Sequence, residues 1–184
     1  ITQGDDNVII GFNAGRYIQQ GDSNVLLGEN AGNGIINGDY NIAVGHNAFS
    51  VISAGSGGNV AIGHESMKSA GTAGNNDASN NTAVGHQSLL AITTADYNVA
   101  VGSNSGDALT TGDGNVLLGF HAGSAVDTQS SLVLIGRSAG GSINDTNANG
   151  TIALGHSALG SLTSGAKNIA IGHESGRYVS TGEA

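Results

Sequence analysis

The sequence predicts an all-β fold, a parallel β-solenoid of about ten coils with about 17 residues in each coil. A glycine follows a short aliphatic triplet at ten places, and successive glycines are 17, 17, 18, 22, 17, 17, 17, 19 and 17 residues apart. The first residue of the triplet is β-branched in every copy, which favours a strand. Polar turns such as GDDN at 4–7 and GDYN at 38–41 separate the triplets.

The ten glycines give the repeat a common numbering, in which position −1 is the residue before the anchor glycine. The anchors are Gly11, Gly28, Gly45, Gly63, Gly85, Gly102, Gly119, Gly136, Gly155 and Gly172. No linker, charge block or change of composition interrupts the array, so we expect a single repeat domain over residues 1–184. The sequence begins within a repeat, and we therefore expect an excerpt of a longer fibrous protein.

Each coil is predicted to contain two short extended segments. Positions −3 to −1 form a strand, and the alternation predicts that the side chains at −3 and −1 point inward. A second segment is expected over +3 to +7, where +3 is Ala or Ser and +7 is aliphatic in nine copies. Position −4 is Asn in eight copies, and we expect a hydrogen-bonded ladder of these side chains. The insertions around 53–58, 71–80 and 144–150 fall in the polar turn and are expected to form edge loops.

Composition argues against several classes of function. The net charge is −9, and the five Lys and Arg are scattered, so we expect no nucleic-acid partner. No apolar run is long enough to span a bilayer, so we expect no membrane insertion. Cysteine is absent, which excludes disulfides and thiolate zinc sites. Because the Ser and His residues recur at regular repeat positions, nothing predicts a catalytic pocket, and we expect no enzymatic activity.

Position −2 is never polar, although the predicted alternation turns it outward. An unbroken exposed apolar stripe indicates an interface. Position +4 is large only where −2 is Ala and is Gly where −2 is Ile or Leu, which indicates one packed layer. We predict that these positions form the seam of a homotrimer; chance and a core within one chain are the alternatives. The predicted interface residues are Ile9, Leu26, Ala43, Phe49, Ala61, Met67, Ala83, Leu89, Ala100, Leu117, Leu134, Ala153, Leu159 and Ala170.

The phrases NTAVGHQSL (81–89) and TIALGHSAL (151–159) resemble the repeats of two related families. One is the repeat of phage-type tail fibres and fibre-like surface proteins; the other is the head repeat of trimeric autotransporter adhesins, a left-handed parallel β-roll. The period is closer to the fibre type, and His often stands where these repeats carry an aromatic residue. The resemblance implies a parallel homotrimer, a left-handed coil and an extracellular, cell-surface or virion location.

The resemblance also implies a structural or adhesive role, as a rigid shaft or head that mediates host or surface attachment. The alternative is a head module that binds a receptor or a glycan. Its predicted contact residues lie in the loop 71–80, and 144–150 is a second candidate loop. The contact residues are Thr72, Asn75, Asn76, Asp77 and Asn80. An ice-binding solenoid is less favoured, because positions −4 to −1 hold Thr only at Thr82 and Thr151.

Two side-chain sets have metal-ligand chemistry. Position +1 is His in five copies and predicts stacked imidazole rings, which could bind a transition metal. Ring stacking alone also explains these residues, and burial would make the rod loosen as the pH falls through about 6. Turn aspartates could bind calcium, but turn formation accounts for them, so we expect no cofactor. The histidines are His46, His64, His86, His156 and His173, and the aspartates are Asp5, Asp22, Asp39, Asp96 and Asp113.

Overall fold

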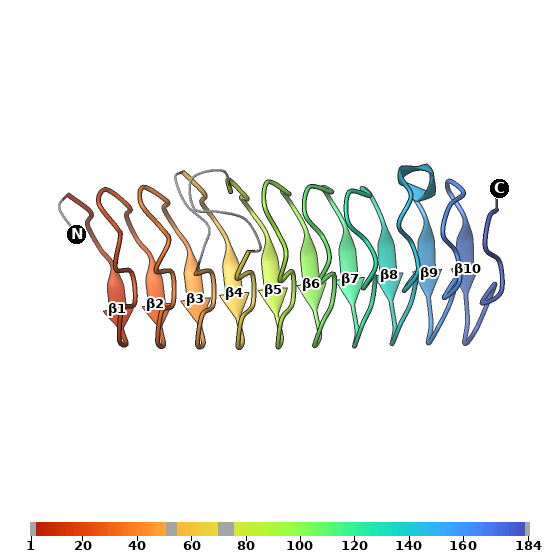
Figure 1. Ribbon diagram of the computed structural model, residues 1–184, viewed down its shortest axis with the longest axis horizontal. Helices are drawn as coiled ribbons and strands as arrows, with labels where there is room; N and C mark the ends of the chain where they lie inside the picture. The colour runs from red at the N-terminus through yellow and green to blue at the C-terminus, as the bar shows by residue number, and fades with distance from the viewer. Residues whose placement is uncertain (1–2, 51–54, 70–75, 183–184) are drawn as a thin grey trace.

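The protein is an all-β parallel solenoid in which ten short strands form one sheet along a rod (Figure 1). The computed structural model describes residues 3–50, 55–69 and 76–182. The strands are β1 (Val8–Ile10), β2 (Val25–Leu27), β3 (Ile42–Val44), β4 (Val60–Ile62), β5 (Thr82–Val84), β6 (Val99–Val101), β7 (Val116–Leu118), β8 (Val133–Ile135), β9 (Ile152–Leu154) and β10 (Ile169–Ile171). The predicted fold class is therefore confirmed.

Every strand pairs in parallel with the strand of the next coil, and equivalent repeat positions lie opposite each other. Val25 pairs with Ile42, and the same register holds between Val60 and Thr82, across the longest gap between anchors. The insertion between β4 and β5 therefore does not shift the sheet. With about 4.8 Å between neighbouring strands, ten strands extend for about 45 Å.

The side chains at position −2 point into the coil, so the predicted orientation of the strands is wrong. In β6, Ala100 is 0% exposed, whereas Val99 and Val101 on either side of it are 37% and 40% exposed. Period-two alternation shows that neighbouring side chains lie on opposite faces. It does not show which face is inside when both sets are apolar, and here the inner set is the one that matches the narrow interior.

The predicted interface residues accordingly lie in the core of a single chain, not on a seam between chains. All of them are buried except Ile9, which is partly buried in the first coil and packs against the core. The residues to which this correction applies are Ile9, Leu26, Ala43, Phe49, Ala61, Met67, Ala83, Leu89, Ala100, Leu117, Leu134, Ala153, Leu159 and Ala170. The alternative of an intrachain core is the one that the structure shows.

The volume compensation between positions −2 and +4 is real and occurs inside this core. A Cβ atom added to Gly32 would lie 2.6 Å from Cδ2 of Leu26, so a large −2 residue leaves no room at +4. Where −2 is Ala, the +4 side chain fills the space, as Leu89 does beside Ala83. Leu89 adopts a φ of 49°, a left-handed conformation that is strained for a residue with a Cβ atom.

The second extended segment does not form; within the described residues, positions +3 to +7 contain turns and no strand. The reason is that +2 and +4 both have left-handed backbone, as at Asn47 (φ 55°) and Phe49 (φ 53°). The turns still stack from coil to coil, because the Gly32 amide donates to the carbonyl of Ala48 at 2.9 Å. Positions +3 and +7 face inward as expected, so Ala48 and Ile35 are buried.

The asparagine ladder at position −4 is present as predicted. The backbone amide and Nδ2 of Asn41 donate to Oδ1 of Asn24 at 2.9 and 3.1 Å, and Nδ2 also donates to the carbonyl of Ser56. The ladder fixes the polar turn of each coil to its neighbours and satisfies buried amide groups. It is interrupted at Leu132 and at Thr151, whose buried Oγ1 lacks a hydrogen-bond partner among the described residues.

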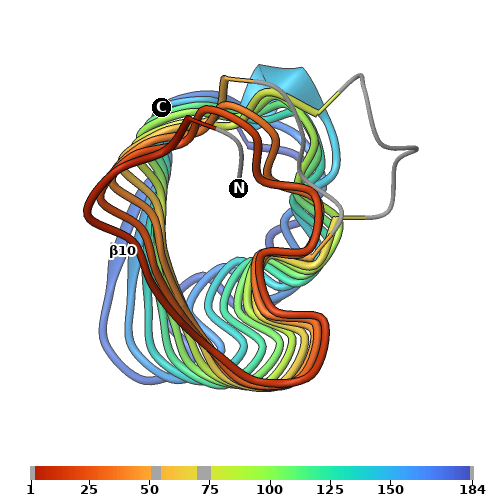
Figure 2. The ribbon, with the colours of Figure 1, turned by 90° about the vertical axis from the view of Figure 1, so that its left-hand side faces the viewer.

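The insertion at 144–150 projects beyond the outline that the coils share (Figure 2). In the 144–150 insertion a short 3-10 helix, η1 (Thr146–Ala148), stands outside the superposed coils when the rod is viewed along its axis (Figure 2). The Asp145 side chain caps it by accepting from the Asn147 amide at 2.9 Å. None of the described residues forms a helix long and apolar enough to cross a membrane.

The predicted receptor residues have different environments. Thr72 and Asn75 lie outside the described residues, as do residues 53–54 of the first insertion. Asn76 is 2% exposed and donates to Ser69 Oγ at 2.8 Å, so its side chain does not face solvent. Its inclusion as a contact residue is wrong, whereas Asp77 and Asn80 are exposed.

Candidate functional site

The largest unassigned apolar surface is the outer sheet face, which we define as the side chains at positions −3 and −1 of the ten strands. Nineteen of these twenty residues are Val, Ile or Leu, Thr82 being the exception. None of the twenty is buried. They are Val8, Ile10, Val25, Leu27, Ile42, Val44, Val60, Ile62, Thr82, Val84, Val99, Val101, Val116, Leu118, Val133, Ile135, Ile152, Leu154, Ile169 and Ile171.

The outer sheet face is continuous because the strands are in register. Equivalent residues such as Val99 and Val116 lie directly opposite each other in neighbouring strands. Soluble monomers rarely expose a contiguous apolar surface of this length, and such surfaces mark interfaces. The sheet therefore has one apolar face turned into the coil and a second apolar face turned away from it.

Position +1 extends this face with an aromatic or imidazole ring in seven of the ten coils, and Glu29, Ser103 and Arg137 occupy the other three. The ring centroids of His46 and His64 are 5.2 Å apart, and those of His64 and His86 are 5.3 Å apart, with interplanar angles of 16° and 6°. The predicted ring stacking is therefore present. These three rings are exposed, as are Phe12 and Phe120, so the burial needed for the expected acid loosening is absent here.

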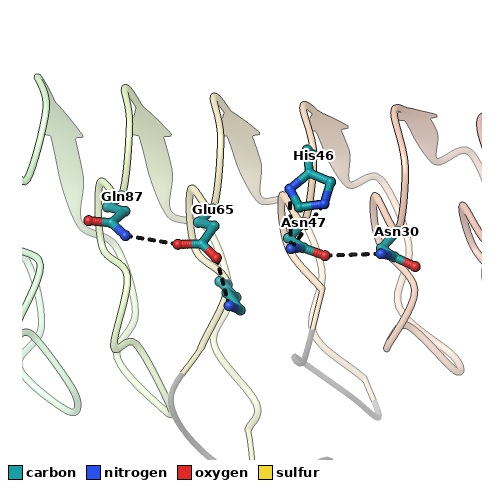
Figure 3. Close-up of polar contacts among 6 residues, drawn as sticks. Asn30, His46, Asn47, Glu65 and Gln87 are labelled. Carbon is teal, nitrogen blue, oxygen red and sulfur yellow. Dashed lines mark hydrogen bonds and ion pairs between the residues drawn. The ribbon is translucent and has the colours of Figure 1, made fainter.

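Position +2 carries polar side chains that bond from coil to coil (Figure 3). Asn30 Nδ2 donates to Asn47 Oδ1 at 3.2 Å. Glu65 accepts from Lys68 Nζ at 2.7 Å and from Gln87 Nε2 at 2.8 Å. These hydrogen bonds, that of Lys68 first and that of Gln87 second, lower the pKa of Glu65 from 4.5 to about 2. The carboxylate beside His64 is thus held by protein donors.

The turn aspartates link the polar turns of neighbouring coils. The backbone amide of Asp5 donates to Oδ1 of Asp22 at 2.8 Å, and that of Asp22 donates to Oδ1 of Asp39 at 2.8 Å. Asp96 and Asp113 form the same contact at 2.7 Å. These contacts join the turns of neighbouring coils and give the aspartates a structural role.

Two histidines and a glutamate converge at the C-terminal end of the rod. His156 and His173 occupy position +1 of the last two coils, with ring centroids 5.0 Å apart and an interplanar angle of 37°. A ligand atom of each ring and one of Glu174 lie within 4.8 Å of one another. In the part of the chain that the structure describes, this is the group of three that could hold a metal ion.

A polar groove runs along one corner of the last four coils, with a volume of about 380 Å³. Its wall is rich in hydroxyl groups, and several of them bond along the rod, as Ser142 Oγ does to the Gly160 carbonyl at 2.7 Å. The lining residues are His121, Ser124, Ser138, Gly141, Ser142, Ser157, Gly160, Ser161 and Arg177. Hydroxyls flanked by a histidine and an arginine suit a hydrophilic ligand such as a sugar.

Comparison of the chain with protein-family models, with curated proteins and with solved structures finds no match. The functional argument therefore rests on the geometry. Sequence reasoning missed the outer sheet face because it placed −3 and −1 in the core. One signal could have found it: −2 varies in size together with +4, whereas −3 and −1 vary among Val, Ile and Leu without any such compensation.

Proposed function

We propose that this chain is a rigid, non-enzymatic segment of a homotrimeric fibre, a phage tail fibre or a bacterial surface adhesin, that mediates attachment to a host or surface. The copies lie parallel and pack through the outer sheet face. The observation that carries the proposal is the row of outward-facing side chains along all ten strands, of which none is buried and all but Thr82 are Val, Ile or Leu. The trimeric stoichiometry and the extracellular or virion location are drawn from the resemblance of the repeat.

The size of the outer sheet face suits a stable protein interface. Ten strands at about 4.8 Å, and five residues from −3 to +1 at about 3.3 Å each, give about 750 Å² per chain. A standard interface buries about 800 Å² per partner. Because the face repeats once per coil, a second copy in parallel places an equivalent coil against every coil, which an unrelated globular surface does not.

The hydrogen-bond pattern supports a mechanical role. Each coil is joined to the next through the strand, through the −4 asparagine, as between Asn24 and Asn41, and through stacked turns such as that of Gly32. Bending the rod would have to break several of these bonds together. Such a stack transmits force along its axis, which is the property that a fibre shaft needs.

The test is the mass in solution by light scattering, measured with the wild type and with Val99→Glu/Val101→Glu. Both side chains are exposed in the single chain, so the fold tolerates the charges, whereas packing between copies does not. We expect a trimeric wild type and a monomeric variant with an unchanged circular-dichroism spectrum. Thr94→Glu, on the polar turn, is the matched control and should remain trimeric. A monomeric wild type, or a trimeric double variant, would refute the interface.

The polar groove favours a second candidate function, glycan recognition by the flank of the rod. Binding of the protein to an immobilised glycan panel would test it, with Ser142→Ala/Ser161→Ala as the groove variant. Loss of a specific glycan signal in this variant would support a recognition head. Absence of any signal from the wild type would leave the shaft role as the better account, and Asp77→Ala/Asn80→Ala, at the exposed predicted contact residues, would then separate a receptor loop from a spacer.

A further inference from the structure

We propose that the last two coils contain a transition-metal site, formed by His156, His173 and Glu174, that binds a divalent ion such as Zn²⁺ or Ni²⁺. Two imidazole nitrogens and one carboxylate oxygen within 4.8 Å of one another form the set. This combination of ligands suits zinc and the later transition metals, whereas calcium prefers oxygen ligands alone. All three ligands belong to one chain, so the set is complete without a second copy, although His156 and His173 lie at position +1 beside the proposed trimer interface.

The backbone of the two coils places the three side chains before any ion binds. The amide of Glu174 donates to the carbonyl of His156 at 2.8 Å, and the Gly172 amide donates to the carbonyl of Leu154 at 2.8 Å. These bonds stack position +1 of one coil on positions +1 and +2 of the next. The ordering of the backbone is thus already achieved by the fold, and metal binding needs only side-chain adjustment.

That adjustment is small. Metal–ligand bonds of about 2.0–2.2 Å place neighbouring ligand atoms of a tetrahedral site about 3.3 Å apart, so the three atoms must approach one another by at most about 1.5 Å. His173 is exposed and can rotate, whereas His156 and Glu174 are half-buried. Water would complete the coordination, as in sites with three protein ligands.

Arg177 competes with the ion for the carboxylate. Its guanidinium Nη1 pairs with Glu174 Oε1, and both side chains are substantially exposed. Exposed ion pairs contribute little to stability, so a metal ion that also gains two imidazole ligands can displace the arginine. Removal of the arginine should therefore strengthen metal binding. If the ion pair instead supported the structure of the site, its loss would weaken metal binding.

The His46, His64 and His86 stack supplies an internal comparison. Its rings are nearly parallel, at 16° and 6°, whereas His156 and His173 are tilted by 37°. Glu65 beside His64 is held by Lys68 and Gln87. Stacked imidazoles thus occur in both stacks. Among the described residues, the ligand atoms of two imidazoles and a carboxylate come together only at His156, His173 and Glu174.

The test is calorimetric titration of tag-free protein with ZnCl₂ and NiCl₂ near pH 7.5. We expect one saturable site per chain, and a loss of affinity of at least about tenfold in His173→Ala and Glu174→Gln. Arg177→Gln should raise the affinity several-fold, and the matched control His64→Ala should not change it. Metal should also raise the melting temperature of the wild type and not that of His173→Ala.

Three outcomes would overturn the proposal. The first is the absence of saturable binding to the wild type. The second is an equal loss in His64→Ala and His173→Ala, which would mean that any stacked histidine pair binds. The third is an affinity for metal that stays unchanged both in Glu174→Gln and in Arg177→Gln. This result would show that the carboxylate is not a ligand. Circular dichroism of each variant confirms that the fold is retained.

Discussion

Exchanging the sizes of two facing core residues tests how the interior of each coil is packed. In the β5 coil Ala83 at −2 faces Leu89 at +4, whereas in the β7 coil Leu117 at −2 faces Gly123. A Cβ atom on Gly123 would lie 2.9 Å from Cδ2 of Leu117. The double substitution Ala83→Leu/Leu89→Gly therefore converts one natural packing solution into the other.

The magnitudes follow from the two single changes. Leu89→Gly empties a fully buried site, which costs about 3 kcal/mol, but it relieves a left-handed φ worth about 1 kcal/mol, so the net loss is about 2 kcal/mol. Ala83→Leu overpacks the same site by about 2 kcal/mol. The double variant regains the volume and keeps the relaxed backbone, so its unfolding free energy should lie within about 1 kcal/mol of the wild type. The coupling energy is then about 3 kcal/mol.

The assay is guanidinium unfolding followed by circular dichroism, at one protein concentration because self-association would make stability depend on concentration. The four proteins of the cycle are compared under identical conditions, so that errors of extrapolation largely cancel. Leu89→Gly combined with Ala153→Leu, whose strand β9 lies four strands away from β5, is the control pair, and its losses should be additive. Additive losses in the Ala83 and Leu89 cycle would refute the shared layer.

Three further predictions follow from the same structure. Ala83→Glu should unfold the chain rather than separate intact subunits, because the side chain is 0% exposed within one chain; size-exclusion chromatography with circular dichroism distinguishes the two. Asn98→Ala should lower the unfolding free energy by about 2–3 kcal/mol, since it removes the acceptor of the buried Asn115 backbone amide and the donor to the Gly112 carbonyl, and denaturant unfolding measures this. The pKa of Glu65 is about 2 in the folded state, below its usual 4.5, so its contribution to the unfolding free energy is present above about pH 4.5 and lost as the pH falls towards 2. This contribution is about 1 kcal/mol after allowance for solvent exposure. Glu65→Gln should remove this acid dependence, and thermal melts across that pH range measure it.

Local chemistry explains which predictions succeeded. The strand at −3 to −1 and the turn at −4 are determined by residues that favour those conformations whatever surrounds them, as β-branched Val99 and turn-forming Asn98 do. The compensation between −2 and +4 also followed from the sequence, because packing at fixed volume leaves a correlation such as that of Ala83 with Leu89. The second extended segment failed because the left-handed backbone at +2 and +4 is adopted by Asn, Glu, Leu and Phe alike and leaves no distinct signature.

The sequence by itself determined the repeat, the parallel register, the asparagine ladder and the existence of two alternating apolar sets in each strand. Only the tertiary structure decided which set lies inside, because alternation is symmetric between faces and both sets are aliphatic. The closed coil breaks that symmetry. Its narrow interior accepts one side chain from −2 together with those from +3, +4 and +7, and it turns Val99 and Val101 outward. The 17-residue spacing of His156 and His173 already predicts that their rings stack, whereas the 37° tilt of the rings and the approach of the Glu174 carboxylate come from the tertiary structure.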